Sequence, residues 1–236
     1  MTAVMSLPRI EAWLAEHGLL LRGGFRPSPG DAVPALPDGR AAASLLLIGN
    51  AGPSLWAHFS RTPEYADAAA NPLDRWSRRI LTALADRLGG LALLPSDGPP
   101  YHPFVAWAKR AEPVAESPLG MLVHPDYGLW HAYRGALALP LRIDLPPRAA
   151  RAAPCETCVE RPCLSACPVG AFGPEGYEVA ICARHIAGDA GADCMDLGCR
   201  ARRACPVGTD YRYGPRQARF HMEAFLAPRR EEVTAR

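Results

Sequence analysis

Apolar and polar residues alternate along the first half of the chain with periods that predict both helices and strands. Residues 8–18, PRIEAWLAEHG, carry apolar side chains at helical spacing, with a proline near the first turn and a glycine at the end. Residues 42–50, AASLLLIGN, form a short apolar run that ends in glycine and asparagine. Such a run is typical of a buried strand.

The clearest predicted helix covers residues 71–90, NPLDRWSRRILTALADRLGG. Asn71 suits the N-cap, Pro72 the first helical position and Gly89 the C-terminal stop. One stripe of this helix is apolar, which predicts that it faces the core. The stripe consists of Leu73, Trp76, Ile80, Leu84 and Leu88.

Three further apolar segments predict strands at residues 90–95, 119–125 and 133–143, each closed by proline or charged residues. Helices and strands therefore alternate, and the expected fold class is α+β. Residues 143–154, IDLPPRAARAAP, are rich in proline and alanine and predict a linker. Residues 215–232 predict an amphipathic helix followed by a charged tail.

Cysteine is confined to one stretch of the chain. All eight cysteines lie between Cys155 and Cys205, and the 154 residues before them contain none. In a reducing compartment, crowded cysteines are more often metal ligands than disulfide partners. The first run, CETCVERPCLSACP, nearly matches the ferredoxin pattern C-x2-C-x2-C-x3-C-P, with two extra residues before its third cysteine.

The pentapeptide ACPVG ends both cysteine runs, at residues 166–170 and 204–208. In two-cluster ferredoxins the cysteine before proline ligates the neighbouring cluster. We therefore expect two 4Fe–4S clusters whose ligand sets cross between the runs. The first set is Cys155, Cys158, Cys163 and Cys205, and the second is Cys167, Cys182, Cys194 and Cys199.

A pair of four-cysteine zinc sites is the alternative, because zinc also favours short Cys-x2-Cys hooks. The repeated x3-C-P ending favours iron and sulfur. Arg200, Arg202 and Arg203 lie inside the second run. They either offset the negative charge of the clusters or form a solvated face.

The charge and hydropathy of the chain limit the kinds of partner that it is expected to bind. The chain of 236 residues has 26 basic and 24 acidic side chains, so we expect no nucleic-acid partner. No apolar run approaches the roughly 20 residues that span a bilayer, and we expect no membrane association. The first residues lack the pattern of a signal peptide, which predicts a cytoplasmic protein.

The segment HPDYGLWHAYRGALALP, residues 124–140, followed by DLPPR, resembles the signature region of the cobalamin-processing chaperones of the cblC type. With NPLDRWSRRILTALADRL and SPLG upstream, the resemblance covers roughly residues 20–148. It implies a nitroreductase-like fold, a corrinoid bound with its lower base detached, and cleavage of the upper-ligand bond, either reductively or by thiol attack. The family's histidine near the lower-base pocket is missing, because VAWAKRAEP occupies that region.

The cysteine-rich part resembles the dicluster module of epoxyqueuosine reductases and reductive dehalogenases, in which two cubanes feed electrons to a corrinoid. Together the resemblances imply three domains: a cobalamin-binding nitroreductase-like domain at 1–148, a ferredoxin-like module with two clusters at 149–215, and a C-terminal helix and tail at 216–236.

These domains imply an oxidoreductase that removes the upper ligand of cobalamin by decyanation or dealkylation, with an external electron donor such as a reductase, ferredoxin or flavodoxin. One alternative is a ferredoxin-like carrier that delivers electrons to a partner enzyme. Another is a corrinoid enzyme like the epoxyqueuosine reductases or dehalogenases.

The chaperone resemblance also implies residues of a corrinoid site. Arg134 matches a family arginine associated with the thiol co-substrate and is the expected catalytic residue; a salt bridge to Asp126 or Asp144 is the alternative. Tyr127 and Trp130 are expected to pack against the corrin, or else to belong to the core. His124 is a candidate cobalt ligand, with a structural histidine as the alternative, and His102 has a weaker claim.

Overall fold

A computed structural model describes residues 6–230 of the chain. The chain forms two compact units. The sheet unit contains residues up to Pro113 together with His131–Ala150, and the cysteine unit contains Val114–Trp130 together with the chain from Arg151 onward. Helices and antiparallel strands occur together, which confirms the α+β class.

The sheet unit is built on four antiparallel strands in the order β1-β2-β6-β3. All eight residues of the central strand β2 are buried, as its apolar run predicted. The elements of this unit are α1 (Leu7–Ala15), β1 (Leu20–Phe25), β2 (Ser44–Ala51), α2 (Trp56–Phe59), α3 (Pro63–Ala66), α4 (Pro72–Leu88), β3 (Leu91–Leu93), α5 (Phe104–Ala111) and β6 (His131–Leu139).

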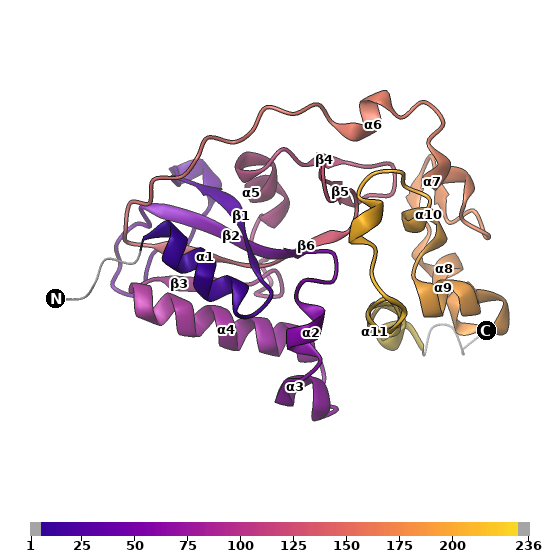
Figure 1. Cartoon of the computed structure of the whole chain (residues 1–236), viewed down its shortest axis with the longest axis horizontal. Helices are drawn as coiled ribbons and strands as arrows, with labels where there is room; N and C mark the ends of the chain where they lie inside the picture. The colour runs from indigo at the N-terminus through magenta and orange to yellow at the C-terminus, as the bar shows by residue number, and fades with distance from the viewer. Residues whose placement is uncertain (1–5, 231–236) are drawn as a thin grey trace. The chain divides into compact units, whose positions relative to one another are not determined.

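Helix α4 runs along the sheet and packs on β3 and β6 (Figure 1). The predicted apolar stripe from Leu73 to Leu88 is buried. The helix begins after Asn71 and ends before Gly89, as the capping pattern indicated. The Asn71 side chain does not cap the helix, however. Its backbone has a φ of 53°, and its carbonyl accepts the first hydrogen bond, from the N–H of Arg75.

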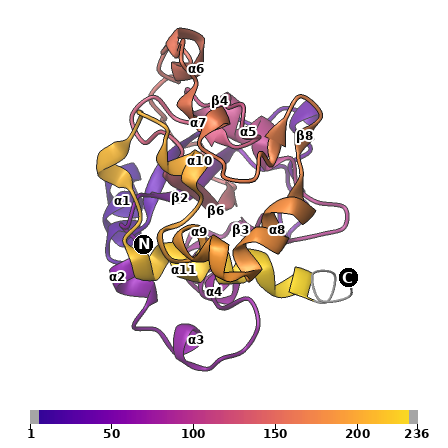
Figure 2. The ribbon, with the colours of Figure 1, turned by 90° about the vertical axis from the view of Figure 1, so that its right-hand side faces the viewer.

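The cysteine unit consists mainly of short helices and two-residue strands. Helices α9 and α11 pack side by side in it, as do α7 and α10 (Figure 2). Its elements are β4 (Ala115–Glu116), β5 (Leu122–Val123), α6 (Pro154–Thr157), α7 (Pro162–Ser165), β7 (Phe172–Gly173), β8 (Gly176–Tyr177), α8 (Val179–Ala187), α9 (Ala192–Leu197), α10 (Arg200–Arg203) and α11 (Pro215–Leu226).

The boundary between the units differs from the one expected at residue 148. The last of the three breaks, between Ala150 and Arg151, lies within the predicted linker, which has no helix or strand before Pro154. Residues 114–130, however, belong to the cysteine unit. The strand expected at 119–125 is only the two residues of β5, because Gly120 turns the chain with a φ of 73° and β5 pairs back onto β4.

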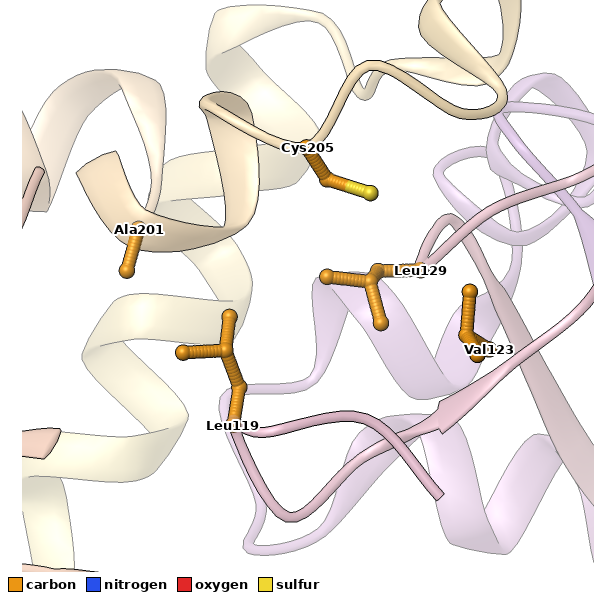
Figure 3. Close-up of a cluster of buried hydrophobic side chains, with 5 residues drawn as sticks. All are labelled: Leu119, Val123, Leu129, Ala201 and Cys205. Atoms are coloured by element: carbon orange, nitrogen blue, oxygen red, sulfur yellow. The ribbon is translucent and has the colours of Figure 1, made fainter. Parts of the chain in front are cut away.

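The segment 114–130, here called the hairpin segment, is part of the core of the cysteine unit. Its side chains Leu119, Val123 and Leu129 turn toward Ala201 and Cys205 (Figure 3). All five residues are buried. The segment therefore provides the apolar floor beneath the second Cys-Pro turn.

Two glycines let the hairpin segment approach this turn closely. A Cβ on Gly128 would lie 2.0 Å from the carbonyl oxygen of Val207, and one on Gly208 would lie 2.3 Å from the backbone of Tyr127. Both distances are far below van der Waals contact. Gly170, which ends the first ACPVG copy, has no atom within 4 Å of such a Cβ.

The described part of the chain contains no helix with the length and apolar character needed to cross a bilayer.

A first prediction concerns the two ACPVG glycines. Both have a positive φ, 61° at Gly170 and 71° at Gly208, so alanine strains the backbone at either position, at a cost of about 1 kcal/mol. Gly208→Ala also forces the hairpin segment away, and its free energy of unfolding should fall by roughly 3 kcal/mol. Urea unfolding of the two variants, loaded alike with metal, measures the difference. Equal losses would show that this close approach does not matter.

A second prediction concerns the ion pair between α3 and α4. Hydrogen bonds from Arg79 hold the pKa of Glu64 at about 2, below its ordinary value. The ionised carboxylate therefore stabilises the fold fully above the unfolded pKa of about 4.5, and this contribution disappears as the pH falls toward 2. Glu64→Gln should lower the free energy of unfolding by about 1–2 kcal/mol at pH 7 and by much less at pH 3.

Urea unfolding at the two pH values checks this prediction. Asp38→Asn is the matched control, because the carboxylate of Asp38 also pairs with an arginine, Arg40, but is largely exposed. The control should leave stability nearly unchanged at either pH, because solvent screens an exposed ion pair. A Glu64→Gln effect that does not depend on pH would contradict the assigned cause.

Candidate metal centre and its adjoining pocket

The eight cysteines gather into two groups of four. Cys155, Cys158, Cys163 and Cys205 line one hollow of the cysteine unit. Cys167, Cys182, Cys194 and Cys199 line another. In each group one cysteine that precedes proline comes from the other run, so the two sets of side chains cross.

Local structure explains why the first group converges. Cys155 lies in α6 and Cys158 ends that helix, while Cys163 lies in α7. Cys205 follows α10, which packs against α7. Prolines 154, 162 and 206 line the same hollow, and a proline has no backbone N–H that would be left unpaired beside the sulfurs.

The thiols of the first group influence one another's ionisation. Burial raises the pKa of Cys155 and Cys163 above the ordinary thiol value, and the neighbouring thiols of the same group raise it further. A positive charge nearby would therefore favour the deprotonated form of Cys155 and Cys163. A bound metal centre supplies that charge and releases the protons.

The second group receives more hydrogen bonds. The N–H of Ala171 donates to Cys167 Sγ at 3.3 Å, and the Tyr177 hydroxyl donates to Cys182. Burial nevertheless raises the pKa of Cys182. Cys199 precedes α10 and accepts hydrogen bonds from backbone N–H groups of that helix, which counteract the effect of its burial.

A single zinc ion would need tighter clustering than a polynuclear centre. Zn–S bonds of about 2.3 Å in a tetrahedron bring the four sulfurs to within about 4 Å of one another. Within residues 6–230, no three cysteine, histidine or acidic side chains are close enough to hold a single metal ion.

A larger pocket of about 420 Å3 adjoins the second group. Cys182 and Cys199 line both this pocket and the hollow of their own group. We call it the aromatic pocket because six of its fifteen lining residues carry rings. The ring-bearing side chains are Trp130, Phe172, Tyr177, Tyr213, His221 and Phe225.

The arginines of the second run have different roles. Arg200 and Arg203 both pair with Asp193, so its carboxylate partly neutralises their positive charge. Arg202 lines the aromatic pocket. It donates from Nε and Nη2 to the carbonyl of Leu129, at 3.0 and 2.6 Å, and its guanidinium carbon lies 4.3 Å from the centroid of the Trp130 ring.

The residues expected at the corrinoid site do not gather within either unit. His124, Tyr127 and Trp130 lie in the cysteine unit, whereas Arg134 lies in β6 of the sheet unit. Asp126, a candidate partner of Arg134, pairs instead with Arg151 at 3.1 Å. The other candidate, Asp144, lies 3.8 Å from Arg26.

His124 is engaged by its own loop. It is buried, and its Nδ1 accepts hydrogen bonds from the N–H groups of Asp126 and Tyr127 at 3.0 and 3.3 Å. Its ring stacks on Tyr127, with centroids 4.3 Å apart, and Tyr127 meets Tyr211 edge to face. The corrinoid roles of His124 and Tyr127 stay predictions. Trp130 is the member of the set that reaches the aromatic pocket.

Sequence reasoning missed a buried polar network in the sheet unit. Arg22, only 1% exposed, donates to Glu112 at 2.8 Å, and the Tyr133 hydroxyl donates to the same carboxylate at 2.6 Å. Burial, and then the charge of Glu112, raises the pKa of Tyr133 far above its ordinary value. The available signal was a charged residue within the apolar segment LLRGGF.

No protein-family model and no curated protein matches the chain. Several solved structures share part of its fold. The first is an epoxyqueuosine reductase from Bacillus subtilis with its catalytic loop swung out of the active site (17% identity, TM-score 0.43, covering 72% of this chain and 50% of that one).

Two further structures bear the same enzyme name. One is an epoxyqueuosine reductase with an epoxyqueuosine-modified tRNA-Tyr stem loop (15% identity, TM-score 0.44, 87% of this chain and 67% of that one). The other is a selenomethionine-labelled epoxyqueuosine reductase (16% identity, TM-score 0.41, 89% of this chain and 68% of that one). With TM-scores below 0.5, these similarities carry no argument about activity.

The tRNA complex corrects one expectation. The balanced charge led us to expect no nucleic-acid partner, but a protein with partly similar structure is seen with RNA. Net charge averages over the whole chain and hides local excess. Here residues 200–230 contain eight arginines and only two acidic residues. The exclusion of nucleic acid therefore does not stand.

Proposed function

We propose that this chain is an iron–sulfur oxidoreductase whose cysteine unit holds two 4Fe–4S clusters. The observation that carries the proposal is the gathering of eight thiols into two crossed groups of four, one of which shares its wall with a pocket of small-molecule size. Clusters held by such groups supply electrons one at a time. The pocket favours an enzyme that acts on a bound molecule over a simple electron carrier.

The residues present fit two clusters. Each group offers four cysteine sulfurs, the donor set that 4Fe–4S clusters take. The two Cys-Pro turns follow the short helices α7 and α10, which pack together. This pairing supports the ferredoxin-like, pseudo-twofold arrangement of the module and the crossed assignment of Cys167 and Cys205.

The surroundings of the two cysteine groups differ. Cys155, Cys158, Cys163 and Cys205 would hold one cluster, and Val159, next to Cys158 in the chain, is 93% exposed. Cys182 and Cys199 of the second group border the aromatic pocket, so a cluster held there would lie beside a bound molecule. Hydrogen bonds to the sulfurs are among the features that set a cluster's potential, and they are more numerous at the second group.

A corrinoid enzyme of the epoxyqueuosine-reductase kind is the second candidate. The solved structures that share part of the fold bear that name, whereas removal of cyanide or an alkyl group from cobalamin gains no support from them. The residues expected to hold a corrinoid do not form a site within either unit, and we derive no step through that group. RNA enters as a candidate partner with this second reading.

A third prediction tests the clusters. Anaerobically reconstituted protein should contain about eight iron and eight acid-labile sulfide per chain. Cys155→Ala and Cys205→Ala should each remove the same half of the low-temperature EPR signal of the reduced protein, and Cys182→Ala the other half. The reason is that the first two residues share one group although they lie 50 positions apart.

Ser165→Ala, a substitution within the first cysteine run that removes no thiol, is the control and should retain both signals. Two outcomes would contradict the assignment. One is a Cys205→Ala spectrum that matches that of Cys199→Ala. The other is a protein that binds two zinc ions per chain and no sulfide.

A fourth prediction separates the two candidate functions. Hydroxocobalamin and an RNA stem loop are added separately to the iron-loaded protein, and binding is followed by visible absorbance and by fluorescence anisotropy. The corrinoid-enzyme reading requires a base-off shift of the cobalamin spectrum together with saturable RNA binding. If neither occurs while the clusters are intact, the corrinoid reading is wrong and the more general oxidoreductase assignment remains.

A further inference from the structure

The aromatic pocket has the walls of a site for a flat conjugated molecule. Phe172 and Tyr177 stack with centroids 4.7 Å apart and planes 11° apart, and Trp130 meets Tyr213 edge to face at 5.2 Å. Aromatic walls favour ligands that are themselves flat rings. A volume of about 420 Å3 takes two or three fused rings.

The pocket also has a hydrogen-bond donor with capacity to spare. The indole N–H of Trp130 is buried and has no hydrogen-bond partner within residues 6–230. This N–H is not accessible even in the ligand-free pocket, so it does not face a bound molecule. Arg202 uses Nε and Nη2 for the Leu129 carbonyl, and its Nη1 group makes no hydrogen bond to the described residues.

The guanidinium of Arg202 cannot move freely. Two hydrogen bonds to one carbonyl fix its plane, and the rings of Trp130 and Tyr213 hold it at 4.3 and 4.6 Å. A fixed positive charge at an apolar wall stabilises negative charge that develops on a nearby oxygen. The unused Nη1 group of Arg202 can therefore donate to an acceptor oxygen at the edge of a flat ring.

We propose that the aromatic pocket binds a quinone, with one carbonyl oxygen facing the guanidinium of Arg202 and the ring against the aromatic walls. The inference rests on the proposed oxidoreductase function. Reduction of a quinone takes two electrons and two protons and converts both C=O groups to C–OH. The electrons originate from an external one-electron reductant and the protons come from water. Cys182 and Cys199 place the second thiolate group at the wall of this site.

The test measures binding by equilibrium dialysis to the purified full chain. The probe is 2,3-dimethyl-1,4-naphthoquinone, whose substituted ring does not alkylate thiols. The matched ligand is 2,3-dimethylnaphthalene, which has the same fused rings without carbonyls. The quinone should bind at least about tenfold tighter, because a hydrogen bond from a charged donor contributes about 1.5–3 kcal/mol.

Two variants test which side chain is the donor. Arg202→Met keeps an unbranched apolar stem but removes the charge and the donors, and it should abolish the tenfold preference for the quinone. Trp130→Phe keeps a ring and removes only an N–H that does not open into the pocket, so it should leave the preference nearly unchanged. Arg212→Met is the matched control, because Arg212 also donates to a backbone carbonyl, that of Arg203, but does not line the pocket. It should leave the preference unchanged.

Each remaining outcome overturns the proposal. These outcomes are equal binding of the two ligands, no saturable quinone binding, an equal loss in Arg212→Met, or displacement of the quinone by hydroxocobalamin, which would assign the pocket to a corrinoid. Circular dichroism shows whether each variant is folded. Iron and sulfide content, measured on the same samples, tests the oxidoreductase proposal separately, so failure of one proposal is not mistaken for failure of the other.

Discussion

The close approach of the hairpin segment to the second Cys-Pro turn is the contact on which the cysteine unit depends. Gly128 and Gly208 bring two backbones together where no side chain fits. This contact places Leu119, Val123 and Leu129 beneath Cys205 and thereby completes the apolar surroundings of the first thiol group. Since Cys205 comes from the second run, the same contact also fixes how the two runs cross.

The crossing in turn organises what surrounds the second group. Helix α10 begins directly after Cys199, so its backbone N–H groups face that sulfur, and Arg202 of the same helix reaches the Leu129 carbonyl at the end of the hairpin segment. One short helix therefore connects a thiol ligand, a fixed positive charge and a pocket wall. The electron source and the bound molecule that we propose are neighbours because of this helix.

Much of this arrangement could be predicted from the sequence. The spacing of the cysteines and the repeated Cys-Pro pair led to the two groups of four that line the two hollows. The apolar stripe of α4 and the buried run of β2 were equally clear, because both depend on local periodicity. These features could be predicted because their signals are residue spacings that can be read directly along the chain.

Features that depend on distant contacts were not predicted. Strand β1 contains two adjacent glycines and a register shift, so its apolar alternation is weak. Helix α5 has apolar residues at helical spacing, at Phe104, Trp107, Ala108 and Ala111, yet this signal was overlooked. The placement of the hairpin segment and the engagement of His124 could not be inferred, since each depends on a tertiary partner.

The excursion of the chain between Trp130 and Arg151 has a consequence for how the protein can be divided. Strand β6 returns to the sheet unit after the hairpin segment has left it, so the polypeptide passes between the units three times. A fragment that starts at the linker would retain every thiol but lose Leu119, Val123 and Leu129, which pack against Cys205. The segments of the two units alternate along the chain, so cutting the chain at one position cannot separate an intact cysteine unit.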